Sequence, residues 1–82
     1  MSISFHGPKG SLDLNNGTAT RILTAMGCTT DTCAGEMPLY KAFLGLEKAK
    51  QELKGQDLEL ACYLETILNE INEAGGDTLE WN

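Results

Sequence analysis

The side chains in this chain that most readily bind metals or attack substrates are one histidine and three cysteines: His6, Cys28, Cys33 and Cys62. Zinc sites need four ligands, usually with cysteines in C-x-x-C pairs, whereas four residues lie between Cys28 and Cys33. His6 could be a third ligand only if the fold places it close to the two cysteines. The fourth ligand would then have to be Cys62 or a carboxylate. We therefore expect no metal, and interpret Cys28 and Cys33 as small packing residues near the end of a helix.

Catalysis by the same groups is also poorly supported. No lysine, arginine or histidine neighbours Cys28 or Cys33 in sequence to favour a thiolate. Acid–base chemistry at His6 needs a partner that the sequence does not nominate, and cysteine–histidine catalysis rests only on the presence of both residue types. The segment Gly7–Gly10 lacks the spacing and the following helix of a phosphate loop, so we interpret it as a turn. We predict no catalytic or cofactor-binding residue, and expect the chain not to be an enzyme.

The elements that position these residues begin with a β-hairpin. Apolar and polar residues alternate over residues 2–6 and 11–14, on either side of the Gly7–Gly10 turn. A short helix follows, with Asn15-Asn16 as its cap and Gly27 at its end. Its apolar stripe consists of Ala19, Ile22, Leu23 and Met26. Residues 28–36 show neither the alternation of a strand nor the periodicity of a helix, and are predicted to be a loop.

Residues 38–74 carry two amphipathic helical patterns that are separated at Lys54-Gly55-Gln56. Pro38 suits the first turn of the first helix, Gly55 would end it, and Asp57 would cap the next. The first helix has a narrow apolar stripe and the second a wider one, so we expect the second to contact both its neighbour and the sheet. The pattern predicts an antiparallel helical hairpin.

Residues 78–82 alternate again, with Leu79 and Trp81 on one side, and are interpreted as a strand that returns to the N-terminal hairpin. A third strand is expected because an isolated two-stranded hairpin is marginally stable. The sequence thus predicts an α+β fold in one domain, residues 1–82. A small three-stranded sheet packs on three helices, the last two forming the helical hairpin.

A chain of 82 residues with 41% hydrophobic residues has the size and composition of a small globular domain of modest stability. Twelve acidic against six basic residues give a formal net charge of −6, which argues against binding to nucleic acid or to anionic membranes. No apolar run is long enough to cross a bilayer, and the first residues do not resemble a signal peptide. We therefore expect a cytoplasmic protein whose cysteines remain thiols.

Charge is unevenly distributed over the last two predicted helices. Residues 57–82 contain no lysine or arginine, whereas the helix before them carries most of the lysines. The simpler interpretation is a solvated acidic face beside a lysine-bearing helix, and the alternative is a docking surface for a basic partner. The acidic residues of this stretch are Asp57, Glu59, Glu65, Glu70, Glu73, Asp77 and Glu80.

Some large apolar residues are not accounted for by the predicted core. Tyr40 and Leu44 lie off the main stripe of their helix and, with Met37, could form a second apolar patch. Trp81 is expected to be anchored against the helices, with an exposed interface position as the alternative. The predicted partner-binding residues are accordingly Tyr40, Leu44, Glu59, Glu65, Glu70, Glu73 and Trp81.

The order of features resembles a group of small bacterial proteins of unknown function. The matching residues are Leu12–Asn16, Ala19–Gly27 and Gly35–Pro38, followed by the helical pair and Leu79-Glu80-Trp81. The resemblance covers most of the chain. It implies the order of the elements but assigns no activity to any residue.

Two functional hypotheses follow. The first is a non-catalytic protein-interaction module, with a second copy of the chain as a candidate partner. The second is an acidic inhibitor or immunity-type protein whose C-terminal carboxylates bind a basic target. Binding through an acidic face should weaken steeply as ionic strength rises, whereas dimerisation through an apolar helix face should hardly change.

Overall fold

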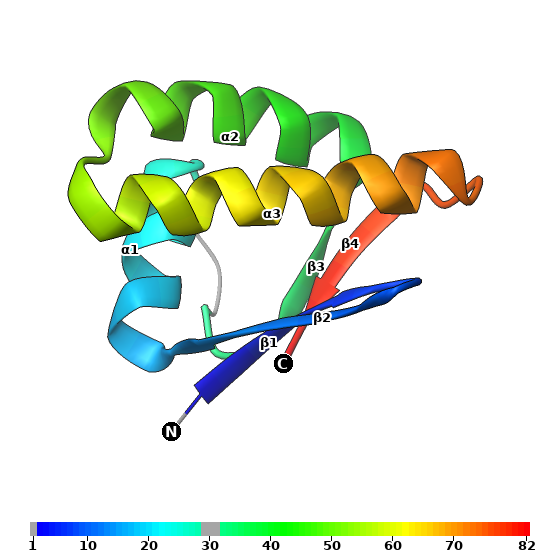
Figure 1. Cartoon of the computed structure of the whole chain (residues 1–82), viewed down its shortest axis with the longest axis horizontal. Coiled ribbons are helices and arrows are strands. Elements are labelled where there is room, and N and C mark those ends of the chain that lie inside the picture. Colours follow the sequence, from blue (N-terminus) through cyan, green and yellow to red (C-terminus); the bar gives the residue numbers. More distant parts are fainter. Residues whose placement is uncertain (1, 29–31) are drawn as a thin grey trace.

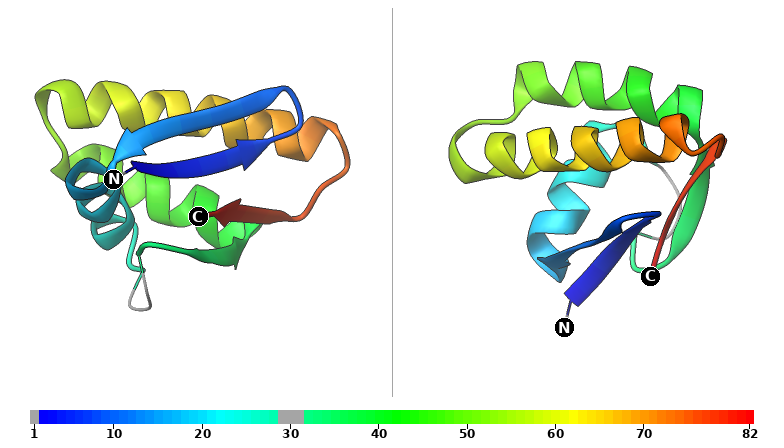
Figure 2. Two further views of the ribbon diagram at one scale, coloured as in Figure 1. Left: turned by 90° about the horizontal axis from the view of Figure 1, so that it is seen from below. Right: turned by 45° about the vertical axis from the view of Figure 1, so that its right-hand side comes forward.

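The structure, a computed structural model, describes residues 2–28 and 32–82, which form four strands and three helices (Figure 1). The strands are β1 (Ser2–Gly7), β2 (Gly10–Asn15), β3 (Gly35–Pro38) and β4 (Thr78–Trp81). The helices are α1 (Asn16–Ala25), α2 (Leu39–Glu52) and α3 (Gly55–Glu73). One face of the sheet is covered by α3, over β1 and β2, and by α2, over β3 and β4 (Figure 2). α1 lies at one end of the molecule and contacts both the sheet and the other two helices. The predicted α+β class and the helical hairpin are confirmed.

The sheet is antiparallel throughout, in the order β2-β1-β4-β3. The predicted hairpin is present as β1 and β2, in which Ile3 pairs with Leu14 and Phe5 with Leu12. β4 lies on the other side of β1 and pairs Trp81 with Phe5, so the predicted return strand is also present. Because side chains alternate between the two faces of a strand, these apolar residues face the helices and the polar residues between them face outwards.

The predicted three-stranded sheet is wrong, because the structure adds β3 at the edge next to β4. The sequence predicts a loop over residues 28–36 and a helical Pro38. A strand of four residues that includes a glycine and a proline shows too little alternation to be recognised. Pro38 is tolerated because an edge strand needs backbone hydrogen bonds on one side only. α2 therefore begins at Leu39, whose N–H donates to the carbonyl oxygen of Asp77 at 2.7 Å.

The ends of α1 agree with the sequence. Asn15 is the N-cap, and its Oδ1 accepts a hydrogen bond from the N–H of Thr18 at 2.8 Å. Gly27 has a φ of 92°, and the N–H groups of Gly27 and Cys28 donate to carbonyl oxygens of the last turn at 3.0 and 2.9 Å. This is a Schellman motif, in which a glycine of positive φ lets the chain satisfy the last carbonyl groups of the helix.

The junction between α2 and α3 differs from the prediction. α2 ends at Glu52, and Gly55 begins α3 rather than ending α2. The φ of Gly55 is 62°, a value that lets the chain reverse direction without strain. Lys54 is the N-cap, so the predicted cap at Asp57 is wrong. The Asp57 carboxylate in the first turn of α3 instead pairs with Arg21, with 2.8 Å between Oδ2 and Nε.

α1 and α2 approach each other at a glycine. Gly45 lies on the buried side of α2, opposite the end of α1. A Cβ at this position would lie 2.4 Å from the carbonyl oxygen of Met26 and 3.1 Å from its Cβ. The absence of a side chain at Gly45 therefore sets how closely the two helices pack.

Replacing Gly45 by alanine should lower the free energy of unfolding by about 1–3 kcal/mol, because the new methyl group meets backbone. Alanine is the better helix former by about 1 kcal/mol, so helix propensity alone would act in the opposite direction. The matched control is Gly17→Ala, whose Cβ would have no neighbour closer than 3.6 Å and which should leave stability unchanged or raised. Urea unfolding followed by circular dichroism measures both. A Gly45→Ala protein as stable as the wild type would contradict the close approach.

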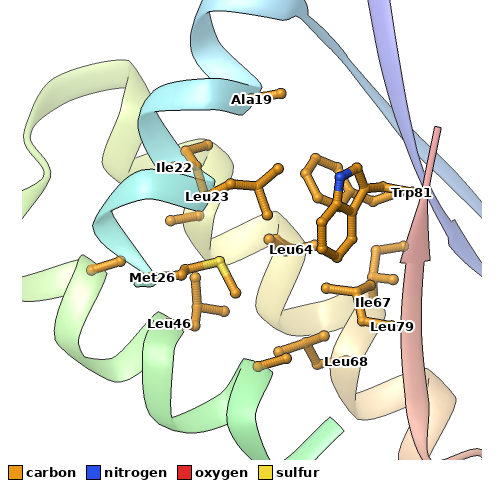
Figure 3. Packing of buried hydrophobic residues seen from close by; sticks show 14 of the residues in the cluster. Ala19, Ile22, Leu23, Met26, Leu46, Leu64, Ile67, Leu68, Leu79 and Trp81 are labelled. Carbon is orange, nitrogen blue, oxygen red and sulfur yellow. The ribbon is translucent and has the colours of Figure 1, made fainter. Parts of the chain in front are cut away.

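Trp81 belongs to the hydrophobic core, and its side chain points from β4 into the cluster of buried residues (Figure 3). It is only 2% exposed, and its ring centroid lies 6.1 Å from that of Phe5 at an interplanar angle of 39°. The predicted anchoring of Trp81 is confirmed. Its Nε1–H has no hydrogen-bond acceptor among the residues that the structure describes. A buried donor without a partner costs about 1–3 kcal/mol of stability. The free energy gained by burying the large ring must exceed this cost.

Trp81→Ala should lower the free energy of unfolding by about 3–5 kcal/mol, because it removes a large side chain from the core. Trp81→Phe should cost less than half as much, since a phenyl ring keeps the contact with Phe5 and removes the unpaired N–H. Urea titrations of the three proteins provide the comparison. Equal losses for the two variants would show that the aromatic ring is not packed as described.

Candidate functional site

The residues considered for chemistry in the sequence lie in separate parts of the structure. His6 is exposed on the outer side of β1, Cys28 is half-buried just after α1, and Cys62 is exposed on α3. Cys33 is exposed before β3, and its Sγ lies 3.8 Å from Asn16 Oδ1. Within residues 2–28 and 32–82, no three histidine, cysteine or acidic side chains are grouped as metal ligands would be.

The open face of the sheet is polar. A row of side chains crosses it from strand to strand, formed by Ser11, His6, Glu80 and Glu36. His6 Nε2 lies 2.5 Å from Asn82 Oδ1, and Ser4 Oγ donates to Asp13 Oδ1 at 2.6 Å. Cross-strand pairs of this kind contribute roughly 0.2–1 kcal/mol each to a sheet. These two contacts favour the pairing of β1 with its neighbours. Glu36 and Glu80 lie directly opposite each other, and like charges in this position oppose the pairing of β3 with β4. We interpret this face as a solvated surface.

A small groove lies where the end of β2 meets the first turns of α1 and α3. Its volume is about 240 Å³, and its lining includes Asp13, Thr18 and Gln56. Small-molecule sites usually have volumes of about 300–1,000 Å³ and are mostly apolar. The groove is smaller and more polar than such a site, so we do not assign a ligand to it.

The outer side of α2 exposes two large apolar side chains, one helical turn apart. Tyr40 is 63% exposed and Leu44 69%. Lys41 and Lys48 are exposed on the same helix. Met37, which the sequence groups with Tyr40 and Leu44, instead packs half-buried against the core. We define Tyr40, Lys41, Leu44 and Lys48 as the α2 face.

An ion-pair cluster marks the seam between α2 and α3. Lys50 Nζ lies 2.8 Å from Glu65 Oε2 and 3.9 Å from Glu47 Oε2. The hydrogen bond with Glu65 raises the pKa of Lys50 above its ordinary value. Glu65, a predicted partner-binding residue, is thus engaged within the molecule.

The outer side of α3 carries the opposite charge. Glu59 and Glu73 are exposed and Glu70 is half-buried, and none of them forms an ion pair with another residue that the structure describes. Tyr63 lies among them and is 63% exposed. Successive residues turn by about 100° around a helix, so Tyr63, two residues before Glu65, points away from the seam. We define Glu59, Tyr63, Glu70 and Glu73 as the α3 face.

The structure divides the predicted partner-binding residues among these places. Tyr40 and Leu44 belong to the α2 face, and three of the four glutamates belong to the α3 face. The alternative of an exposed Trp81 is wrong, because its pairing with Phe5 directs the indole into the core.

Sequence reasoning did not select Lys41, Lys48 or Tyr63. The useful signal was helical spacing relative to the seam, because Lys48 is two residues from Lys50 and therefore lies on the far side of α2. The spacing shows which residues point outwards only when the side of each helix that faces its neighbour is known.

A second ion pair joins α1 to α3. Arg21 donates from Nε and Nη2 to the two carboxylate oxygens of Asp57, at 2.8 and 3.1 Å. This two-pronged geometry gives the strongest arginine–carboxylate contacts. The hydrogen bond lowers the pKa of Asp57 below its ordinary value and raises that of Arg21. The pair fixes the start of α3 against α1.

No protein-family model, curated protein or solved structure matches this chain. In the parts of the chain that the structure describes, no helix combines the length and hydrophobicity needed to span a membrane.

Asp57→Asn should remove an acid-sensitive part of the stability. Because the pKa of Asp57 is lowered in the folded protein, its ion pair stabilises fully above the ordinary value of 3.8 and loses its effect as the pH falls through the lowered pKa. The difference in urea midpoint between wild type and Asp57→Asn should be largest near neutral pH and shrink below about pH 4. A difference that stays constant over this range would contradict the role assigned to the pair.

Proposed function

We propose that this chain is a non-catalytic protein-interaction module whose binding surface is the outer side of α2 and α3. The observation that carries the proposal is the exposure of Tyr40 and Leu44, at 63% and 69%. Single exposed apolar residues are normal on a protein surface, but two large ones one turn apart on a helix form a continuous strip. Apolar strips with this spacing are a common means by which helices bind other proteins.

The packing of α2 supports the same conclusion. Leu39, Ala42, Leu46 and Ala49 fill its buried side, so Tyr40 and Leu44 are not needed to hold the helix on the core. Covering a large apolar side chain contributes about 1.5–3 kcal/mol. For a domain of 82 residues, this is a substantial gain from a partner.

The second candidate function is an acidic inhibitor or immunity-type protein that binds a basic target. It is favoured by the α3 face, where three glutamates without ion pairs to other described residues lie one turn before and two to three turns after the exposed Tyr63. A surface of one charge attracts oppositely charged partners and speeds their association. In this version Asp57 and Glu65 take no part, because both are engaged within the molecule. Either function suits a cytoplasmic protein, in which the exposed Cys62 remains a thiol.

A photo-crosslinking side chain on α2 tests the proposal. We expect p-benzoylphenylalanine in place of Leu44 to cross-link one specific protein, a second copy or another chain, in a lysate of the source cells. The matched control places the same group at Ser11, on the open face of the sheet, where no specific product should form. Identical products from the two positions, or no product from position 44, would refute an interaction through α2.

Salt separates the two candidates. Cross-linking from position 44 should fall only in part as the ionic strength rises, since salt screens charges at the rim of a contact but acts weakly on its apolar centre. For the acidic inhibitor, a cross-linker in place of Tyr63 should give the stronger product, and that product should disappear at high salt. This comparison uses the same lysate and the same chemistry at both positions.

A further inference from the structure

We infer that the partner of this surface is a second copy of the same chain, packed so that the α2 face of each copy covers the α3 face of the other. The inference rests on the proposed function and names its partner. Each face has an apolar residue between two charged ones, and the charges have opposite signs. In α2 the order is Lys41, Leu44, Lys48, and in α3 it is Glu59, Tyr63, Glu70.

The two sets of charges lie on the outer surface of the helical layer, one on each side of the seam between α2 and α3. The ion pair between Lys50 and Glu65 marks the seam. Lys48 precedes Lys50 by two residues and Tyr63 precedes Glu65 by two, a rotation of about 200° around each helix. The α2 and α3 faces are therefore both turned away from the seam, with Lys41 and Lys48 on α2 and the glutamates on α3. The exposed Glu47 of α2 lies nearer the seam, 3.9 Å from Lys50.

Two-fold symmetry offers two ways to stack one such layer face to face on another. An axis across the helices places α2 on α2 and α3 on α3, so that lysines face lysines and glutamates face glutamates. An axis along the seam places α2 of each copy on α3 of the other, and both contacts then join opposite charges. Facing like charges oppose association, whereas opposite charges favour it. The charge pattern selects the axis along the seam.

The positions along the helices agree with this arrangement. α2 and α3 are antiparallel and are joined at one end (Figure 1). An axis along the seam keeps these connected ends together in the two copies. Lys48 and Glu59 both lie towards the connected end, and Lys41 and Glu70 lie towards the other end. Lys48 of each copy therefore faces Glu59 of the other, and Lys41 faces Glu70.

The same arrangement brings the exposed apolar side chains together. Leu44 and Tyr63 fall between the charges of their helices, so they meet at the centre of each contact, with Tyr40 beside them. An aromatic and apolar centre with a charged rim is the usual composition of a protein interface. Tyr40, Leu44 and Tyr63 are the large hydrophobic residues that stay exposed in the described part of the chain, and the dimer covers all of them.

The available area is sufficient for a stable dimer. A specific interface buries at least about 600 Å² per copy, roughly one eighth of the 4779 Å² surface of this chain. Helices of 14 and 19 residues are about 21 and 28 Å long and pack about 10 Å apart. Their shared outer side offers an area of that order.

The test is a charge exchange between the two faces, with the mass measured by sedimentation at high protein concentration. The wild type should have twice the 8.9 kDa mass of the chain. Lys41→Glu/Lys48→Glu and Glu59→Lys/Glu70→Lys should each be monomeric, with the Kd of the dimer raised about a hundredfold or more. An equimolar mixture of the two variants should regain the dimer mass. In the mixed dimer the two altered faces attract each other, and so do the two unaltered faces.

The matched control is Glu36→Lys/Glu80→Lys on the open face of the sheet. It changes the net charge by the same amount as Glu59→Lys/Glu70→Lys and should leave the dimer intact. The inference is overturned by a monomeric wild type, by a mixture that stays monomeric, or by a control that dissociates. If the wild type is monomeric while a cross-linker at position 44 captures a different protein, the proposed function stands and only this choice of partner is wrong.

Discussion

The packing of Trp81 between two other strands is the interaction on which the rest of the structure depends. β4 is the last element of the chain, yet it lies inside the sheet between β1 and β3. Trp81 pairs with Phe5 on one side and with Gly35 on the other. A Cβ at Gly35 would lie only 2.9 Å from the indole ring, so the glycine makes room for the tryptophan. An aromatic residue across from a glycine on an edge strand is a recurrent way to stabilise such a pair.

The binding surface is a consequence of this core. Because β4 joins β1 to β3, the sheet is broad enough for α2 and α3 to lie side by side on one face. Gly45 sets the close approach of α1 to α2, and the Lys50–Glu65 pair closes the seam between the two longer helices. These contacts involve the sides of α2 and α3 that point towards the core or towards the other helix of the helical hairpin. Among the residues described, the outer sides are left with three exposed apolar side chains, with Lys41 and Lys48 beside those of α2 and with glutamates beside Tyr63 on α3.

Much of the fold was predictable from the sequence because it follows from local patterns. Alternation revealed the β1–β2 hairpin and β4, and helical periodicity revealed the three helices, including the cap at Asn15. β3 was missed because its four residues are defined by pairing with a distant strand rather than by their own pattern. Gly55 was misassigned because a glycine of positive φ suits either the end of one helix or the start of the next. The role of Asp57 depends on Arg21, which lies 36 residues away, and no local signal connects them.

Trp81 is the sole tryptophan, so its fluorescence reports directly on the insertion of β4 into the core. The measurement is a urea titration in which tryptophan emission and the helical circular dichroism signal are recorded on the same samples. If β4 holds the sheet beneath the helices, the emission maximum should be that of a buried indole. The two transitions should also coincide, as expected for a single cooperative unit. A tryptophan transition that is complete before the helices unfold would show that the fold does not depend on β4.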